Sequence, residues 1–458
     1  MNWRSSALRG TANSLREGGR LLVSAVAGAA SLAAMAALGA LTVAHRTFGL
    51  AAGALVALAG LVLADPLLIA VAAFPGTLLL QRAGGGAAGS SLSLSDLIVV
   101  AASAIAVTKI RFDAAPTLRR SLVPIAAFEL LLLLTVLDHP NIHGSLEWAH
   151  RIFMVAGSLA VGWAVANSGR ARQAAVALLV ASMVLALFTL EHAVTLHFKP
   201  AQWGLYQKNY LGAMMWMTVV IAHLNPRWLN LPPRLARAGK YLCGLALLAS
   251  QSKQSIIALM VVLLYTVVRQ PSVRRRSKLL LVSLVPLAIV TYLLITTEVA
   301  NLAVNPQNSI GIRLTEYAAD FHVWASSPIF GQGLRWFYLP QFASYIQPPD
   351  IFVETLVAGG IVGVIAMIVL LGGYASVFLS LPREIGTIAL VLVLGRAVEA
   401  VFDIYWVAGA GTLPWLVAGL AIGTWDATLA GHTVMRGTTD GGTTENVPAP
   451  VPAPAASQ

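Results

Sequence analysis

The chain has few charged residues and almost no cysteine, and both shortages narrow what it can be. Only 11% of its 458 residues are charged, whereas soluble domains carry about 25%. The single cysteine, Cys243, lies in an apolar run, so a disulfide within the chain and a cysteine metal site are both excluded. The net charge of +11 is spread over many short links, and we expect no nucleic-acid partner.

Long apolar runs take the place of the missing charge. Apolar residues make up 57% of the chain, and runs of about 17–25 residues recur from Leu21 to Leu429, each long enough to cross a bilayer as a helix. The sequence therefore predicts an all-α polytopic membrane protein with about 12–14 transmembrane helices, several of them short enough to be re-entrant or merged. The predicted spans lie near residues 21–43, 48–64, 66–81, 95–110, 121–137, 149–167, 173–194, 209–224, 240–251, 254–268, 278–296, 351–372, 385–401 and 409–428.

Basic residues are divided unevenly between the two sides of these spans. If the N-terminus is cytoplasmic, the alternating links place 21 of the 30 lysines and arginines inside and the remaining 9 outside. This bias agrees with the positive-inside rule. It predicts that both termini are cytoplasmic and that residues 305–350 lie on the outer side.

Composition divides the chain into five consecutive parts. We expect a basic cytoplasmic N-terminus over 1–20, transmembrane helices over 21–296, an outer loop that carries the site over 297–350, transmembrane helices over 351–430 and a disordered cytoplasmic tail over 431–458. The tail is rich in Gly and Thr and then in Pro and Ala, a composition that cannot bury a core.

The stretch from Asn305 to Gly363 is the longest polar segment in the chain, so we expect function to lie there. Apolar residues at a spacing of three to four, from Leu314 to Trp324, predict a helix over about 310–326. Its apolar stripe predicts a helix that lies on the membrane surface and covers a cavity among the later spans. A surface helix with only a local Arg–Glu pair would give a similar pattern.

Charged and aromatic side chains follow in the same loop. Arg335 stands among aromatic residues after a Pro/Gly-rich turn, and Asp350 and Glu354 stand one helical turn apart where the chain re-enters the membrane. A guanidinium forks onto phosphate oxygens, so the arginines of the loop suit a phosphate or diphosphate. Trp336 and Tyr317 suit the face of a sugar, or else anchor the loop at the lipid interface.

One pattern runs through the loop: Arg313-x-x-x-Tyr, then Trp324-Ala-x-x-Pro-x-x-Gly-x-Gly, then P-x-x-F-x-E-x-L-x-x-x-G-x-x-G. Two earlier segments accompany it, Q-K-N-Y-L-G-A at 207–213 and A-S-Q-S-K-Q-S at 249–255. Together they resemble the O-antigen ligase and O-antigen polymerase family over roughly residues 200–375. Members of that family are metal-independent membrane glycosyltransferases with a GT-C-like helical fold.

The resemblance implies a function at the bacterial cytoplasmic membrane. The chain would move a glycan from an undecaprenyl-diphosphate carrier to a glycan or lipid acceptor on the outer face, as polymerase or ligase of a surface polysaccharide. Its partners would be the lipid-linked oligosaccharide donor, the acceptor and membrane lipids. No Asp-x-Asp motif occurs in the outer links, so we expect no Mg²⁺-bound nucleotide sugar, no metal and no cofactor.

The same resemblance assigns roles to individual residues. Positioned cations stabilise the charge that develops on the leaving diphosphate, and this role makes Arg313 catalytic. A base takes the acceptor's proton: Asp350 is the first candidate, Glu354 the second and His322 the third. Binding of the diphosphate and glycan is expected from Arg313, Arg335, Lys253, Lys208, Asn209, Trp336 and Tyr317. The family usually has His-Asn at Pro349-Asp350 and Ser-Arg at Ser252-Lys253; the missing histidine favours a polymerase, or a ligase with another acceptor.

Two other classes stay open on the sequence alone. A transporter or flippase of lipid-linked glycans needs charged residues through both leaflets and two related halves, and the sequence offers Glu129 and no clear internal repeat. A non-catalytic membrane assembly protein would use the loop only as a docking surface.

Overall fold

The computed structural model of the chain describes residues 65–80, 93–197, 199–201, 206–270, 309–407 and 409–438, together with Gly60 and part of the stretch 278–303. The predicted N-terminus, the span predicted over 21–43, all but Gly60 of the span predicted over 48–64, and the tail beyond residue 438 lie outside the described residues. The chain forms two compact units, Met1–Leu68 and Ile69–Gln458, and nearly all of the described residues belong to the second.

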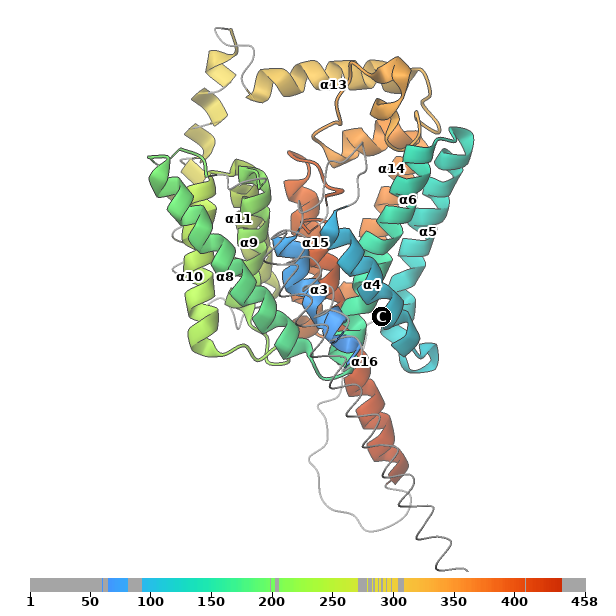
Figure 1. The fold of residues 1–458 in the computed structure, drawn as a ribbon, viewed down its shortest axis with the longest axis vertical. Helices are drawn as coiled ribbons and strands as arrows, with labels where there is room; N and C mark the ends of the chain where they lie inside the picture. Colours follow the sequence, from blue (N-terminus) through green and yellow to red (C-terminus); the bar gives the residue numbers. More distant parts are fainter. Residues whose placement is uncertain are drawn as a thin grey trace, which may run out of the picture. The chain divides into compact units, whose positions relative to one another are not determined.

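The regular elements that the structure describes are all helices, which confirms the predicted all-α membrane fold (Figure 1). Five of its helical stretches are long and apolar enough to cross a membrane: Pro116–Asp138, Ile142–Asn167, Ala171–Thr195, Ile351–Ser380 and Leu413–Gly431. The longer helices are α3 (Leu67–Leu79), α4 (Leu94–Lys109), α5 (Pro116–Asp138), α6 (Ile142–Ile152), α7 (Ser158–Asn167), α8 (Ala171–Thr195), α9 (Lys208–Leu224), α10 (Pro233–Ser250), α11 (Lys253–Arg269), α13 (Ser309–Ala325), α14 (Ile351–Ser380), α15 (Arg383–Glu399) and α16 (Leu413–Thr438).

Several helices extend beyond the spans that apolar runs predict. The span predicted from residue 149 begins at Ile142, because α6 and α7 continue into each other through one π-helical turn, Phe153–Gly157. The first part of α6 contains Glu147, whose charge lowers the hydropathy there, yet this side chain is fully buried and ion-paired. Charged residues that neutralise each other inside a helix bundle are therefore what the hydropathy pattern missed.

One end of the bundle is held together by Asp426 on α16. Its carboxylate accepts hydrogen bonds from the backbone N–H groups of Thr117 and Leu118, at 3.1 and 3.2 Å, and from Trp163 Nε1 at 3.0 Å. The N-terminus of α5, where no side chain of its own caps the helix, thus receives an acidic cap from a distant segment. This joins α5, α7 and α16 into one frame.

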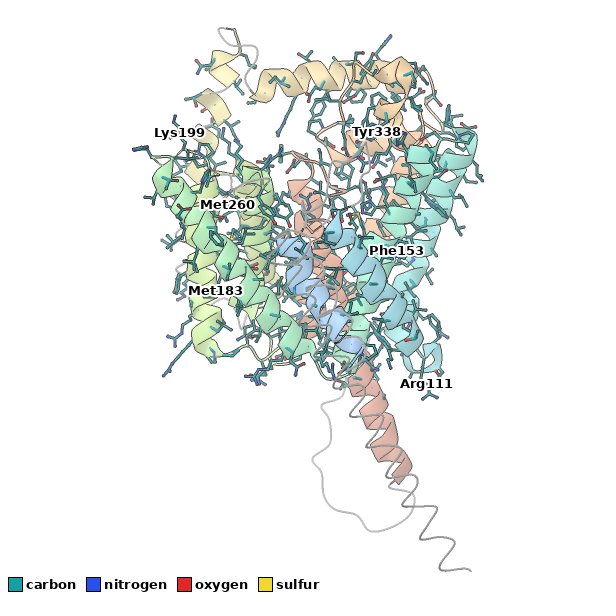
Figure 2. The ribbon with its side chains drawn as sticks, viewed as in Figure 1. Arg111, Phe153, Met183, Lys199, Met260 and Tyr338 are labelled. Atoms are coloured by element: carbon teal, nitrogen blue, oxygen red, sulfur yellow. The ribbon has the colours of Figure 1, made fainter. Side chains whose placement is uncertain are left out.

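The other end carries the polar loop. The helix predicted over 310–326 is confirmed as α13, which runs across the ends of the membrane helices in Figure 1. Figure 2 shows Tyr338 and Lys199 at this end of the unit and Arg111 at the opposite end. The loop after α13 packs on the first turn of α6, where a Cβ added to Gly144 would lie 2.9 Å from the Leu334 carbonyl oxygen.

The Pro/Gly-rich turn after α13 docks onto a break in α14. Gly360 has φ 60° and ψ −155°, so α14 consists of two helical pieces joined at a kink. The freed backbone groups bond to the turn: Ile361 N–H to Pro328 O, Val362 N–H to Ile329 O, Gln332 N–H to Val357 O and Gly333 N–H to Ala358 O, at 2.8–3.1 Å. The glycines of the turn and of α14 thus allow the helix to break inside the bundle, because the backbone groups freed at the break bond to the backbone of the turn.

Replacing Gly360 by alanine should disrupt this junction. The added Cβ would lie 2.2 Å from the Ile329 carbonyl oxygen, on a residue whose positive φ already disfavours any side chain. We expect the free energy of unfolding in detergent to fall by about 2–4 kcal/mol. Gly372→Ala in the same helix is the control, because no atom of the described residues lies within 4 Å of its Cβ position. Equal stability of the two variants would contradict the role of the break.

The predicted topology has a direct test. Ser344 and Ser168 are both exposed, and the basic-residue bias places Ser344 outside and Ser168 inside. In a Cys243→Ala background, Ser344→Cys should react with a membrane-impermeant maleimide in intact cells, and Ser168→Cys should react only after the membrane is opened. Labelling of both from the same side would exclude this topology.

Candidate functional site

A cavity of about 470 Å³ lies under α13, and we call it the α13 cavity. It brings together residues from five separate regions of the sequence: the start of α9, the turn between α10 and α11 with the first residues of α11, position 295, α13 itself, and Phe402 after α15. Its lining residues are Lys208, Asn209, Gln251, Lys253, Gln254, Ile257, Ile295, Ile310, Arg313, Leu314, Tyr317 and Phe402. Five of the sequence-predicted site residues are therefore in one place: Lys208, Asn209, Lys253, Arg313 and Tyr317.

Two helices begin at this cavity with a lysine. Lys208 is the first residue of α9 and Lys253 the first of α11, and in neither of these described helices does the cap residue's side chain accept a hydrogen bond from a first-turn backbone N–H group. Helix N-termini present N–H groups and a partial positive charge, so both reinforce the lysines. Arg313 comes from the opposite wall, where its Nη2 donates to the Phe402 carbonyl oxygen at 2.7 Å. The cavity is consequently suited to an anion.

The local sequence explains why the two lysines lie close together. Gln251 adopts a left-handed conformation, φ 54°, that reverses the chain between α10 and α11 within two residues. This turn packs on α9 at Gly212, where an added Cβ would lie 2.5 Å from Ser252 Cβ. The two early motifs of the sequence are thus neighbours in space because a glycine lets α9 approach the turn.

Apolar side chains form the rest of the wall. Ile257, Ile295, Ile310 and Leu314 line the cavity beside its cations. Leu314 is also 56% exposed, so α13 offers an apolar surface next to the charged one. A ligand with a charged group and a hydrocarbon chain would match both kinds of surface.

A polar cluster behind the cavity was not predicted as part of the site. Gln254, which lines the cavity, donates to Asp403 Oδ2 at 3.0 Å, and its neighbour Ser255 donates to the buried Glu399. Glu399 also accepts from Trp216 Nε1 at 3.0 Å and pairs with Arg396 at 2.9 Å. Nothing in the sequence shows that α11 lies against α15, so this cluster could not be predicted from it.

Asp350 caps α14 and lies within the electrostatic reach of the α13 cavity without lining it. Its Oδ1 accepts from the backbone N–H groups of Phe352 and Val353, at 2.7 and 3.1 Å. Burial raises the pKa of Asp350 above its usual value, although these two N–H groups and Arg313 act in the opposite direction. Asp350 in turn helps burial to raise the pKa of Tyr317. This carboxylate is therefore coupled to two residues that do line the cavity.

Arg335 and Glu354 belong to a separate, buried ion network. Arg335 contacts Glu147 Oε2 through Nε at 2.9 Å and Nη2 at 2.8 Å, and Arg151 bridges Glu147 Oε1 at 3.0 Å and Glu354 Oε1 at 3.2 Å. The Arg151 guanidinium also lies 4.3 Å from the Trp406 ring centre. This network ties the loop to α6 and α14, so the structure does not bring Arg335 or Glu354 to the α13 cavity.

Trp336 also lies away from the cavity. It is fully buried and packs edge-on against Phe337, Phe342 and Tyr345, with ring centres 5.2–5.9 Å apart. Such packing orders the loop. His322, by contrast, is exposed on α13 and is not among the residues that line the α13 cavity.

Residues 238–368 match the family described as O-antigen ligase. The match extends from α10 through α11, α13 and the loop into α14, past the break at Gly360, and it confirms the resemblance seen in the sequence. No curated protein matches the chain. The α13 cavity thus receives Lys253, Arg313 and Tyr317 from the matched region and Lys208 and Asn209 from just before it.

Proposed function

We propose that this membrane protein of the O-antigen ligase family transfers a glycan from a polyprenyl-diphosphate carrier to an acceptor hydroxyl on the outer face of the membrane. One observation supports this most: Lys208, Lys253 and Arg313, with two helix N-termini, converge on a cavity that also has an apolar wall. A diphosphate needs the cations, and a polyprenyl chain needs the apolar wall.

In the proposed reaction, an acceptor hydroxyl oxygen attacks the anomeric carbon of the donor glycan. The bond between that carbon and the diphosphate oxygen breaks, and the electron pair leaves with the polyprenyl diphosphate. Arg313, Lys208 and Lys253 stabilise the charge that develops there, in a site whose cations need no rearrangement. The hydroxyl proton passes to a carboxylate, for which Asp350 is the first candidate.

Asp403 is a second candidate for the base. Gln254 holds its Oδ2 next to the cavity, and Asp403 Oδ1 accepts from its own chain at Ile404 N–H. Either aspartate lies near enough to the proposed diphosphate site for its carboxylate to accept the proton of the acceptor hydroxyl. The acceptor is another lipid-linked glycan in a polymerase and a lipid in a ligase. The two reactions therefore differ in the part of the site that binds the acceptor.

The test is transfer by the purified protein. Full-length protein in detergent is given an undecaprenyl-diphosphate glycan, with no ATP and no nucleotide sugar, and the products are separated by mass. Elongated lipid-linked glycan identifies a polymerase, and glycan on an added lipid acceptor identifies a ligase. If no transfer occurs, but the donor crosses the bilayer of a proteoliposome, the transporter alternative replaces this proposal.

A further inference from the structure

A second cavity lies at the opposite end of α9 and α10, and we call it the α9–α10 cavity. Its volume is about 270 Å³, and it is lined by Ala222, His223, Asn225, Pro233, Ala236, Arg237 and Lys240. α9 begins at the α13 cavity and ends after 17 residues beside this second one, a length of about 25 Å. The two cavities are thus separated by nearly the thickness of a bilayer's hydrocarbon core.

The lining of the α9–α10 cavity combines small residues with cations. On α10, Pro233, Ala236, Arg237 and Lys240 share one helical face, so small side chains leave the space and two long basic ones border it. His223, at the last turn of α9, is only 7% exposed. Among the described residues no carboxylate lines the cavity, and the sequence has no Asp or Glu between Glu191 and Glu298. The cavity therefore favours an anion.

The link between the two helices is ordered by its own hydrogen bonds. Asn225 ends α9 in a left-handed conformation, and its side chain donates to the Leu231 carbonyl oxygen at 3.1 Å and accepts from Leu231 N–H at 2.9 Å. Trp228 Nε1 donates to the Glu384 carbonyl oxygen at 3.0 Å, which fixes the link to α15. These bonds hold in place the ends of α9 and α10 that border the cavity.

An apolar stripe leads away from the basic residues along α10. Tyr241, Leu245 and Leu248 follow on the face of Arg237 and are about half exposed. Gly244 lies among them, and no atom of the described chain lies within 4 Å of its Cβ position. The missing side chain leaves a shallow groove in the apolar stripe. Lys240 Nζ lies 4.5 Å from the Tyr241 ring centre, where the charged and apolar surfaces meet. A free phosphate would need only the cations, whereas an amphiphile uses both surfaces.

We propose that the α9–α10 cavity binds the phosphate headgroup of an anionic phospholipid, with an acyl chain along Tyr241, Gly244, Leu245 and Leu248. Basic cavities between membrane helices are suited to such headgroups, because each Lys or Arg adds attraction at the membrane surface. The phospholipid would come from the leaflet opposite the α13 cavity. This site is separate from the α13 cavity, so its occupancy by a lipid does not depend on the transfer reaction.

Native mass spectrometry of the full-length protein in detergent tests this with three probes: phosphatidylglycerol, phosphatidylcholine with the same acyl chains, and inorganic phosphate. We expect phosphatidylglycerol to bind more tightly than phosphatidylcholine. Arg237→Ala and Lys240→Ala should each weaken phosphatidylglycerol about fivefold, and together by about 30-fold. Gly244→Leu, which fills the groove, should weaken both lipids. Arg172→Ala, another exposed basic residue at the start of α8, is the control and should change nothing.

Three results would overturn the proposal: equal affinity for the two lipids, an unchanged affinity in the Arg237→Ala/Lys240→Ala variant, or full displacement of phosphatidylglycerol by millimolar inorganic phosphate with no effect of Gly244→Leu. The last result would identify a site for free phosphate. Because Arg237 and the Gly244 position face open space, unchanged melting temperatures should show that the variants fold.

Discussion

Arg313→Ala should reduce glycan transfer by about 10²–10³, the usual cost of losing one charged donor from a preorganised anion site. Arg313 is the guanidinium that the α13 helix contributes to the α13 cavity, opposite Lys208 and Lys253. Arg313→Lys should recover only part of the rate, because an ammonium keeps the charge but cannot fork onto two phosphate oxygens. The measurement is the initial rate of transfer from an undecaprenyl-diphosphate glycan.

The matched control for this variant is Arg335→Ala. Arg335 lies in the same loop region, but its partners are Glu147 and Gln347 rather than the cavity. Its loss should lower stability by leaving Glu147 buried with one fewer cation, and transfer by the folded fraction should fall much less than in Arg313→Ala. A larger loss of transfer per folded molecule in Arg335→Ala would place the diphosphate in the ion network.

Asp350→Asn should slow transfer by about 10²–10⁴ without weakening donor binding, if Asp350 is the base. An asparagine can still accept the Phe352 and Val353 N–H bonds, so the cap of α14 is retained. The substitution therefore separates the two roles of this carboxylate. Asp403→Asn is the companion variant, since an amide oxygen can still accept from Gln254. Normal transfer by Asp350→Asn together with loss in Asp403→Asn would assign the base to Asp403.

The pH profile gives a second readout for the same residue. A base must be deprotonated, so transfer falls as pH drops through its pKa. Burial raises the pKa of Asp350, so this fall should begin at a higher pH than an exposed aspartate would give. Removing the Arg313 charge, as in Arg313→Ala, should move the fall in transfer rate to still higher pH, because Arg313 lowers the pKa of Asp350.

Part of the site followed from the sequence, because it lies in local patterns. The stripe from Leu314 to Trp324 predicted α13, and the bilayer-length runs placed Lys208 and Lys253 at the outer ends of spans, where α9 and α11 do begin at these residues. Because α13 covers the ends of these helices, Arg313 on α13 lies near Lys208 and Lys253, and all three line the same cavity.

The remainder depended on contacts between distant segments. Arg335 pairs with Glu147, 188 positions away, and Glu354 with Arg151, 203 positions away, so no local pattern could reveal the ion network. The same pairs let α6 carry charge within a span, which moved the start of that span from residue 149 to Ile142. The break at Gly360 was also hidden, because an apolar helix and a broken apolar helix have the same hydropathy.

The most direct test of the central claim is a cryo-electron microscopy structure of the full-length protein with undecaprenyl diphosphate bound. We expect the two phosphates in the α13 cavity, within hydrogen-bonding distance of Arg313 and at least one of Lys208 and Lys253, with the polyprenyl chain leaving past Ile257 or Leu314. Phosphates beside Arg335 and Glu147, or anywhere outside the α13 cavity, would contradict the account.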